Sequence, residues 1–282
     1  MYYYTRIEMN SKDSLVIKLL VKHVKENKNL YTSFNFSNVH QKYHLADYLY
    51  VILIVLKTGI AWRYVEELKI NIGWNSVYKV YQKLNKAGIF KIAYTDLLKK
   101  YLKKCPNKKL RYVLTDTSFV PNKKGKDMYG YNTYYNKKNG TKISLITDSN
   151  GIPLNMKCYM GNKCDSKILL DHLENSDIVC TNHIDKYKRY FLADPGYDSK
   201  EVREALEKLN YESIIAQNRR NIKDPTKLIS LTDNEENIYK KRLKIENTFS
   251  KMKMNRRLCL RYDSKIESYI GFIYLSFIKM LC

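Results

Sequence analysis

Apolar residues recur with two different periods along the chain, which predict helices first and strands later. The longest apolar segment near the N-terminus, residues 43–59, is predicted to be a helix, because Gly59 is a favoured residue just past a helix C-terminus. In residues 76–88 the apolar residues follow the i, i+3, i+4, i+7 spacing of a helix that buries one face: Val77, Val80, Tyr81 and Leu84. The first hundred residues are therefore expected to be helical.

The lysines of the second helix fall on the face opposite to its apolar residues. A short segment, residues 61–70, and a turn, residues 71–75, precede this helix. A short helix, a turn and a helix with a basic outer face form the outline of a helix-turn-helix DNA reader. Contacts to DNA are then expected from Lys79, Lys83 and Lys86. A helical bundle with a solvated lysine face explains the same pattern equally well.

From about residue 108 the pattern becomes that of strands. Residues 110–120 are rich in β-branched and aromatic residues, and residues 141–161 form two such runs separated by Asp-Ser-Asn-Gly, a hairpin signal. Helices and strands are then expected to alternate: helix 165–175, strand 187–194, helix 199–210, strand 211–218 and a final helix from about 238. This order predicts an α/β domain in which helices flank a mixed sheet.

Two aspartates lie where predicted strands end. Asp116 is near the end of the first strand, and Asp194 ends the fourth, where Pro195 and Gly196 force the chain to turn. Catalytic groups are often held at strand ends, because the sheet is rigid and the loop is open. Taken alone, each aspartate is more often a turn residue or a helix cap.

The final helix holds eight Lys or Arg residues between residues 238 and 258, but only one acid, Glu246. At about 100° per residue, four side chains fall within roughly 60° of one another: Tyr239, Arg242, Glu246 and Lys253. The neighbouring apolar stripe, which is expected to dock on the sheet, comprises Ile238, Ile245, Phe249 and Met252. Glu246 is thus expected at the border between core and solvent, and Lys240, Lys244 and Lys251 are expected to point away.

The charge of the chain indicates a polyanionic partner. The net charge is +23, from 51 basic and 28 acidic residues, which favours nucleic acid. A membrane is disfavoured, because the longest apolar runs, residues 49–56 and 270–282, are shorter than the ~20 residues that span a bilayer. The N-terminus has no apolar leader, and the six cysteines form no C-x-x-C pair. We expect a protein that is not secreted, with reduced thiols, in the cytoplasm or nucleus where the host DNA lies.

Three motifs together resemble a known family. The spacing Y-x2-R-x3-E-x6-K, on the four aligned residues named above, matches the signature of a large group of bacterial insertion-sequence transposases. Residues 115–120 and 191–199 resemble the first and second Asp motifs of that family, and the resemblance extends over roughly residues 40–275. It implies a DDE-class enzyme with a ribonuclease H-like catalytic domain at residues 108–282, after a helical, DNA-binding domain at residues 1–107.

The resemblance implies that Asp116, Asp194 and Glu246 are catalytic and hold two Mg²⁺ ions, for which Mn²⁺ can substitute. They would cut transposon ends and join the 3′-hydroxyl to target DNA, with DNA contacts from Tyr239, Arg242 and Lys253. The partners implied are double-stranded DNA, at terminal inverted repeats and at the target, and further copies of this chain, in a homodimer or higher oligomer on the DNA.

Other interpretations remain open at this point. A domesticated or inactive relative that only binds DNA is the alternative, and a structure-selective nuclease on the same fold is a third. The acids are 78 and 52 residues apart, so no large domain is inserted between the last two. Asp198 is expected to cap the following helix, and Asp165 fits either a helix cap or a loop motif of the same family.

Overall fold

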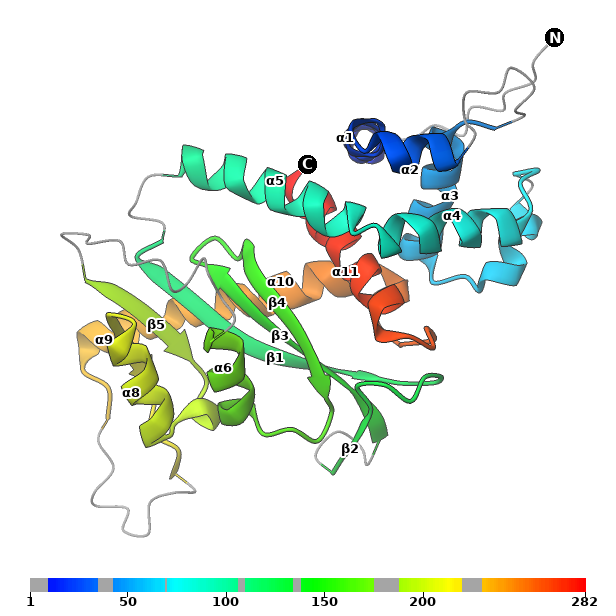
Figure 1. Cartoon of the computed structure of the whole chain (residues 1–282). Helices are drawn as coiled ribbons and strands as arrows, with labels where there is room; N and C mark the ends of the chain where they lie inside the picture. The colour runs from blue at the N-terminus through cyan, green and yellow to red at the C-terminus, as the bar shows by residue number, and fades with distance from the viewer. Residues whose placement is uncertain are drawn as a thin grey trace. The chain divides into compact units, whose positions relative to one another are not determined.

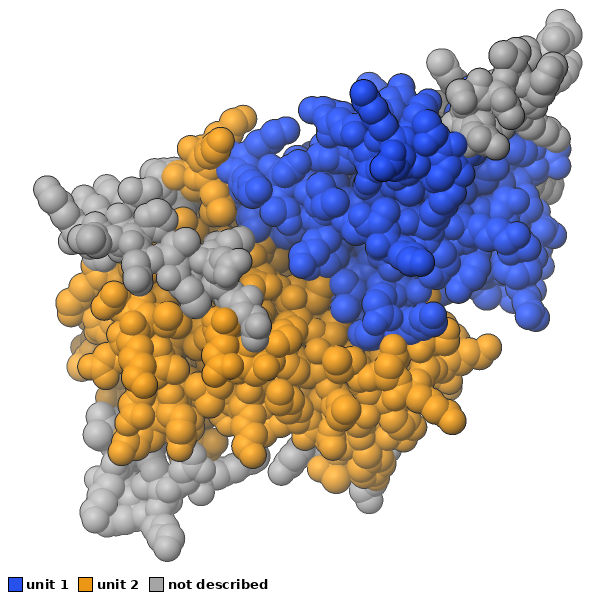
Figure 2. Space-filling view, in the orientation of Figure 1, with its two compact units in different colours: residues 1–101, 252–259, 265–282 blue, residues 102–251, 260–264 orange. Residues whose placement is uncertain are grey.

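The structure is a computed structural model that describes residues 10–34, 43–68, 70–105, 110–133, 138–174, 188–219 and 230–282. Its contacts divide the chain into two units (Figure 2). The helical unit comprises Met1–Tyr101, Met252–Cys259 and Lys265–Cys282, and the sheet unit comprises Leu102–Lys251 and Leu260–Ser264. The helical unit thus takes in segments from both ends of the chain, and the predicted domains 1–107 and 108–282 stay a prediction.

The helical unit consists of helices with one buried face. Gly59 adopts a left-handed conformation, with φ 71°, at the end of the first long helix, as predicted. All four residues of the predicted apolar face at residues 76–88 are buried. The described helices that lie wholly or mostly in this unit are α1 (Ser11–Glu26), α2 (Lys28–Ser33), α3 (Leu45–Thr58), η1 (Trp62–Leu68), α4 (Trp74–Lys86), α5 (Ile89–Lys104), η7 (Arg256–Leu258) and α11 (Ile266–Leu281).

Aromatic rings join α4 to the C-terminal helix α11 in the core of the helical unit. The rings of Tyr81 and Phe272 stack with centroids 4.5 Å apart, and Trp62 packs against both at 5.4 and 5.9 Å. The Arg257 guanidinium lies 5.2 Å from the Phe272 centroid. The apolar C-terminal segment is therefore a core helix of this unit.

Within the described residues, no single helix is long and apolar enough to cross a bilayer. In the same ranges, one pair of helices, α3 and η1, has that length and composition when the two are taken together, and they are bent by 110° relative to each other.

The sheet unit contains one mixed sheet of six strands (Figure 1). The central strand β1 pairs antiparallel with β3 and parallel with β5, which confirms the predicted α/β fold. The order is β2-β3-β1-β5-β6, with β4 paired to β3. The strands are β1 (Tyr112–Pro121), β2 (Gly130–Asn132), β3 (Lys138–Asp148), β4 (Pro153–Met160), β5 (Arg189–Ala193) and β6 (Tyr211–Ile215).

Helices cover both faces of this sheet, with α6 (Asp165–Glu174) on one face and α10 (Leu243–Lys253) passing across the other (Figure 1). A hydrogen bond of 2.9 Å between Ser144 Oγ and His172 Nδ1 ties β3 to α6. On the opposite face, Thr248 Oγ1 of α10 donates to the carbonyl of Gly151 in the β3–β4 turn, at 2.7 Å. The predicted hairpin at this turn is confirmed, and Gly151 has the positive φ, 78°, that such a turn requires.

The segment predicted as one final helix has a break. It consists of α9 (Asp233–Tyr239), a 3-10 turn η6 (Lys240–Arg242) and α10. The prediction of a single regular helix is therefore wrong, although Ile238, Ile245 and Phe249 of its apolar stripe are buried as predicted. The 3-10 turn changes the direction of the side chains before residue 243 relative to those that follow.

The expected cap at Asp198 is also wrong. Ser199 caps α8 (Lys200–Lys208), with its hydroxyl accepting from the Val202 amide at 3.3 Å. The Asp198 carboxylate instead pairs with Arg203 at 2.7 Å and accepts from the Asn218 amide at 3.0 Å. It therefore links the start of α8 to the chain that follows β6.

A fully buried arginine holds the loops at one end of the sheet unit. Arg261 donates to the carbonyl of Asp127 at 2.8 Å, to Thr141 Oγ1 at 3.0 Å and to the carbonyl of Asp263 at 3.1 Å, and it pairs with the Asp127 carboxylate. Its exposed fraction is 0%. Removal of this side chain would leave several acceptors buried without donors, which is costly.

We expect Arg261→Met to lower the free energy of unfolding by about 3 kcal/mol, because methionine replaces the volume but none of the hydrogen bonds. Urea denaturation followed by circular dichroism measures this. The control is Arg256→Met, at an exposed arginine, for which we expect a change within about 0.5 kcal/mol. Equal losses in the two variants would contradict a structural role for Arg261.

Candidate active site

Asp116 and Asp194 come together through the register of two parallel strands. Leu114 of β1 pairs with Leu192 of β5. Two residues further along each strand are Asp116 and Asp194, so they emerge at the same level of the sheet. Because β5 ends at Ala193, Asp194 leaves the sheet beside Asp116, and the 3-10 turn η3 (Pro195–Tyr197) carries the chain away.

Arg242 connects the second aspartate to the glutamate. Its Nη1 lies 3.6 Å from Asp194 Oδ2, and its Nη2 lies 3.5 Å from Glu246 Oε1. The arginine side chain is only 15% exposed, whereas the two carboxylate side chains are 48% and 51% exposed. The guanidinium thus lies mostly below the surface, and both carboxylates remain open to a ligand from the solvent side.

Asp116 is the most buried of the three acids, and its pKa reflects this. The pKa of Asp116 is raised from 3.8 to about 6, mainly by burial and in smaller part by the negative charges of Asp194 and Asp165. The Thr117 amide, which donates to Asp116 Oδ1 at 2.8 Å, and the charge of Arg242 act in the opposite direction. Asp116 therefore senses the charges of both Asp194 and Arg242, and Arg242 in turn pairs with Glu246.

Tyr239 lies beside this group. The Arg242 guanidinium is 5.6 Å from the centroid of its ring. Burial raises the pKa of the Tyr239 hydroxyl, the charge of Arg242 lowers it, and Asp194 and Asp116 raise it. Tyr239 therefore lies next to Arg242 and within electrostatic range of Asp194 and Asp116.

A second layer of polar residues supports β1 from the other face of the sheet. Thr117 Oγ1 donates to Asp165 Oδ1 at 2.9 Å, and Lys142 Nζ donates to the same oxygen at 2.8 Å. Lys142 is buried, with 7% of its surface exposed, and it also donates to the carbonyl of Lys163. Sequence reasoning singled out Asp165 but missed Lys142, whose only signal is that it is the one charged residue in the stretch 139–147 of β3.

The donor chemistry of the three acids suits a hard cation. Carboxylate oxygens are the ligands that Mg²⁺ prefers. Among the residues that the structure describes, however, no group of three His, Cys, Asp or Glu side chains is arranged to hold a metal ion. The positive charge next to Asp194 and Glu246 is that of the Arg242 guanidinium.

The remaining predicted DNA contacts lie in the helical unit. Lys79, Lys83 and Lys86 are all exposed on α4, opposite its buried face. Lys83 Nζ also donates to the Ser33 carbonyl at 2.6 Å and lies 4.5 Å from the Phe34 ring. Lys253 lies in the last turn of α10 and belongs to the helical unit. Contacts of these four lysines with DNA stay a prediction.

The mixed sheet, with helices on both faces and acids from two neighbouring strands and a helix, defines a ribonuclease H-like catalytic domain. A family described as "Transposase DDE domain" matches residues 107–277, which is more than half of the chain. The chain therefore belongs to the DDE transposase family, and it is a DNA transposase.

Similar proteins agree with this family. The chain is 29% identical over 140 residues to a Brucella ovis protein described as a transposase for insertion sequence element IS6501, with 48% of this chain and 93% of that protein covered. It is 27% identical over 153 residues to a Burkholderia cepacia protein described as a transposase for insertion sequence element IS402, with 54% and 67% covered.

A solved structure shares the fold. The piggyBac transposase, in a synaptic complex with hairpin DNA, superposes with a TM-score of 0.52 at 11% identity. The match covers 95% of this chain and 74% of that chain. At this identity the likeness concerns the fold alone.

The raised pKa of Asp116 has a consequence for stability in metal-free buffer. Because the pKa of Asp116 in the folded protein, about 6, is above its ordinary value of 3.8, the stabilising effect is complete below pH 3.8 and is lost as the pH rises through 6. We expect Asp116→Asn to match the wild type near pH 4 and to be more stable by roughly 2 to 3 kcal/mol near pH 8. Urea unfolding in EDTA at several pH values measures the difference, and a difference that does not vary with pH would contradict the assignment.

Proposed function

We propose that this transposase cuts DNA at transposon ends and joins the freed 3′-hydroxyl to target DNA, with Asp116, Asp194 and Glu246 as the catalytic acids. The observation that carries the proposal is the shared Arg242, which pairs with Asp194 and Glu246 and also influences Asp116. A cation shared by acids from different elements favours a common site. Isolated turn residues or helix caps would not share a cation in this way.

The three carboxylates would hold two divalent metal ions. When bound, Mg²⁺ or Mn²⁺ supplies Lewis-acid stabilisation of charge on the phosphodiester and lowers the pKa of an attacking water or hydroxyl. Above a pH of about 6 the Asp116 carboxylate is ionised and able to act as a ligand. Asp194 and Glu246, each about half exposed, face the solvent from which DNA arrives.

Arg242 has two roles in this proposal. In the free protein it reduces the repulsion between Asp194 and Glu246, which keeps both near Asp116. When DNA is bound, its guanidinium is placed to donate to a phosphate oxygen next to the scissile bond. Tyr239 packs against Arg242 and orients it, and its ring or hydroxyl contacts the DNA.

The DNA partners are the terminal inverted repeats and the target duplex. Lys79, Lys83 and Lys86 on α4, together with Lys253, would contact backbone phosphates. Joining two ends to one target requires two active sites close together, so we propose that a homodimer or higher oligomer assembles on the DNA.

The test is cleavage and strand transfer on duplexes that carry the ends of the element, with and without Mg²⁺. We expect no product in EDTA, and a rate at least roughly 10²- to 10³-fold lower for Asp116→Asn, Asp194→Asn or Glu246→Gln. The control is Glu212→Gln, at a half-exposed glutamate paired with Lys188, which should retain the wild-type rate. Cleavage in EDTA, or full activity in any of the three variants, would contradict the proposed roles.

Arg242 is tested by two substitutions. Arg242→Gln removes the charge and should lower the single-turnover rate at saturating DNA by roughly 10²-fold, because a positioned cation no longer stabilises developing negative charge. Arg242→Lys keeps the charge but cannot form two separate contacts in a fork, so an intermediate rate is expected. Identical rates for Arg242→Gln and for Lys251→Gln, at an exposed lysine of the same helix, would reduce the segment to a general cationic surface.

A further inference from the structure

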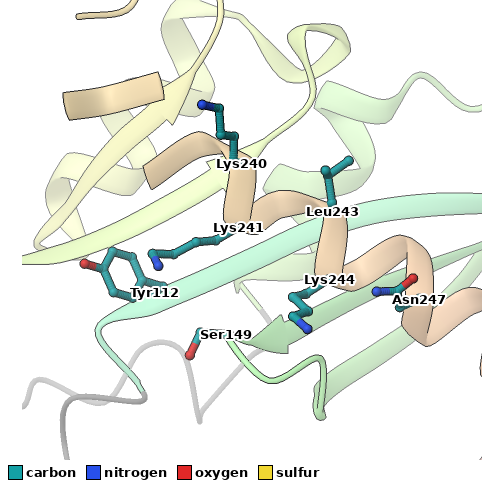
Figure 3. A pocket seen from close by; sticks show the side chains of 7 residues that line it. All are labelled: Tyr112, Ser149, Lys240, Lys241, Leu243, Lys244 and Asn247. Atoms are coloured by element: carbon teal, nitrogen blue, oxygen red, sulfur yellow. The ribbon is translucent and has the colours of Figure 1, made fainter. Parts of the chain in front are cut away.

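A pocket lies beside the catalytic acids on the sheet unit, between the start of β1 and the η6–α10 segment (Figure 3). Its volume is about 360 Å³. Its polar lining comprises Tyr112, Ser149, Lys240, Lys241, Lys244 and Asn247. Three of these six side chains are lysines from five consecutive residues, and each is exposed to solvent.

Within the described ranges, no carboxylate forms an ion pair with Lys240, Lys241 or Lys244. The Lys240 ammonium donates to the neutral Asn237 side chain. Arg242, between them in the sequence, is by contrast paired with two acids. Lys241 and Lys244 point toward Tyr112 and Ser149, whereas Lys240 points away from them (Figure 3). Two ammonium groups at one cavity repel each other until an anion enters.

The wall of the pocket at Tyr112 is rigid and also cationic. Lys241 Nζ lies 5.2 Å from the centroid of the Tyr112 ring, and the Arg111 guanidinium lies 5.7 Å from it. The ring is stacked on Tyr190 of the neighbouring strand, with centroids 5.5 Å apart. Arg111 Nε is buried with no hydrogen-bond partner among the described residues. The aromatic stack therefore holds the Tyr112 ring in place, and Arg111 adds a further positive charge beside that ring.

The pocket is too far from Asp116 to hold the scissile phosphate. Tyr112 and Asp116 are four residues apart on β1, so their side chains share one face of the sheet at a separation of roughly 13 Å. Phosphates of one DNA strand are separated both along and around the helix axis, so this straight-line distance corresponds to about two nucleotide steps. A strand whose scissile phosphate lies at the acids thus has another phosphate within reach of the pocket.

We propose that this pocket binds a backbone phosphate of the DNA strand that is cut, about two nucleotide steps from the scissile bond. This inference rests on the proposed function, and it assigns Lys241 and Lys244, with Asn247 and Ser149, to a specific phosphate. It also separates Lys244 from Lys251, which the helical periodicity treats alike as cations pointing away. Lys251 does not line the pocket.

The experiment compares two double variants of the full-length chain that remove the same charge. Lys241→Ala with Lys244→Ala empties the pocket of two cations, and Lys208→Ala with Lys251→Ala removes two exposed lysines outside it. Binding of a blunt duplex is titrated by fluorescence anisotropy in EDTA at several salt concentrations. For the pocket variant we expect weaker binding and a slope of log K against log salt that is shallower by about 0.9, which is the loss of one phosphate contact. The control variant should keep the wild-type slope.

A second measurement keeps the proposal testable if the pocket variant does not fold. Lysines of the wild-type chain are acetylated with and without the duplex, and modification is read by mass spectrometry. We expect Lys241 and Lys244 to be protected more than Lys208 and Lys251. Equal salt slopes in the two variants, or equal protection of the four lysines, would overturn the proposal. Protection by inorganic phosphate alone, with no further effect of the duplex, would assign the pocket to a small anion and would also overturn it.

These outcomes are distinct from a failure of the proposed function. Both measurements use DNA binding without metal, so they do not depend on cleavage. If the wild type cleaves end DNA while both double variants bind alike, the function stands and the pocket proposal is wrong. If the pocket lysines are protected while no DNA is cleaved under any condition, the pocket proposal stands and the catalytic roles are wrong.

Discussion

The site depends on one guanidinium that two carboxylates share. Acids that are brought together repel one another, and a fold that brings the Asp194 and Glu246 carboxylates within 3.6 Å of one side chain needs that side chain to be a cation. Arg242 provides it from the 3-10 turn η6, one helical turn before Glu246 on α10. Because α10 is fastened to the sheet by the bond from Thr248 to Gly151, the position of this cation is fixed relative to β1 and β5. The openness of the two outer carboxylates and the raised pKa of the inner one follow from the same arrangement.

The break before α10 gives neighbouring basic residues different tasks. Arg242 faces the acids, whereas Lys241 and Lys244 line the pocket against Tyr112 (Figure 3). A polyanion that crosses this segment meets paired and unpaired cations in turn. The large positive charge of the chain is therefore not spread evenly along residues 238–258, and where each cation points decides whether it acts on the acids or on a more distant phosphate.

Features that depend on local sequence could be predicted. The left-handed Gly59 after α3, the buried face of α4 and the hairpin at Gly151 each follow from the periodicity of apolar residues or from a turn residue. The meeting of Asp116 with Asp194 follows only in part. Asp194 leaves β5 at its end, as predicted, but the expectation that Asp116 ends its strand is wrong: Asp116 lies in the middle of β1, which continues to Pro121. The two meet because β1 extends beyond the end of its parallel neighbour β5. The alignment of Arg242 with Glu246 needs only their separation of four residues.

Features that depend on distant partners could not be predicted. Arg261 looks like one more surface cation in the sequence, but its acceptors at Asp127 and Thr141 are more than a hundred residues away. Lys142 also looks like a surface cation in the sequence, but its partner Asp165 lies 23 residues further along the chain, at the start of α6. The 3-10 turn at residues 240–242 contains no Gly or Pro that would predict a break in the helix. The pocket could not be predicted either, because the periodicity of one unbroken helix assigns wrong directions to the side chains of Lys241 and Lys244.

The central claim is that Asp116, Asp194 and Glu246 form one electrostatic unit through Arg242, and the pKa of Asp116 reports on it directly. That pKa can be measured from carboxyl ¹³C shifts in protein labelled at aspartate, in metal-free buffer, for the wild type and for Arg242→Gln and Asp194→Asn. The account predicts a value near 6 in the wild type, a higher value in Arg242→Gln and a lower value in Asp194→Asn. An Asp116 pKa that is the same in all three proteins would contradict it.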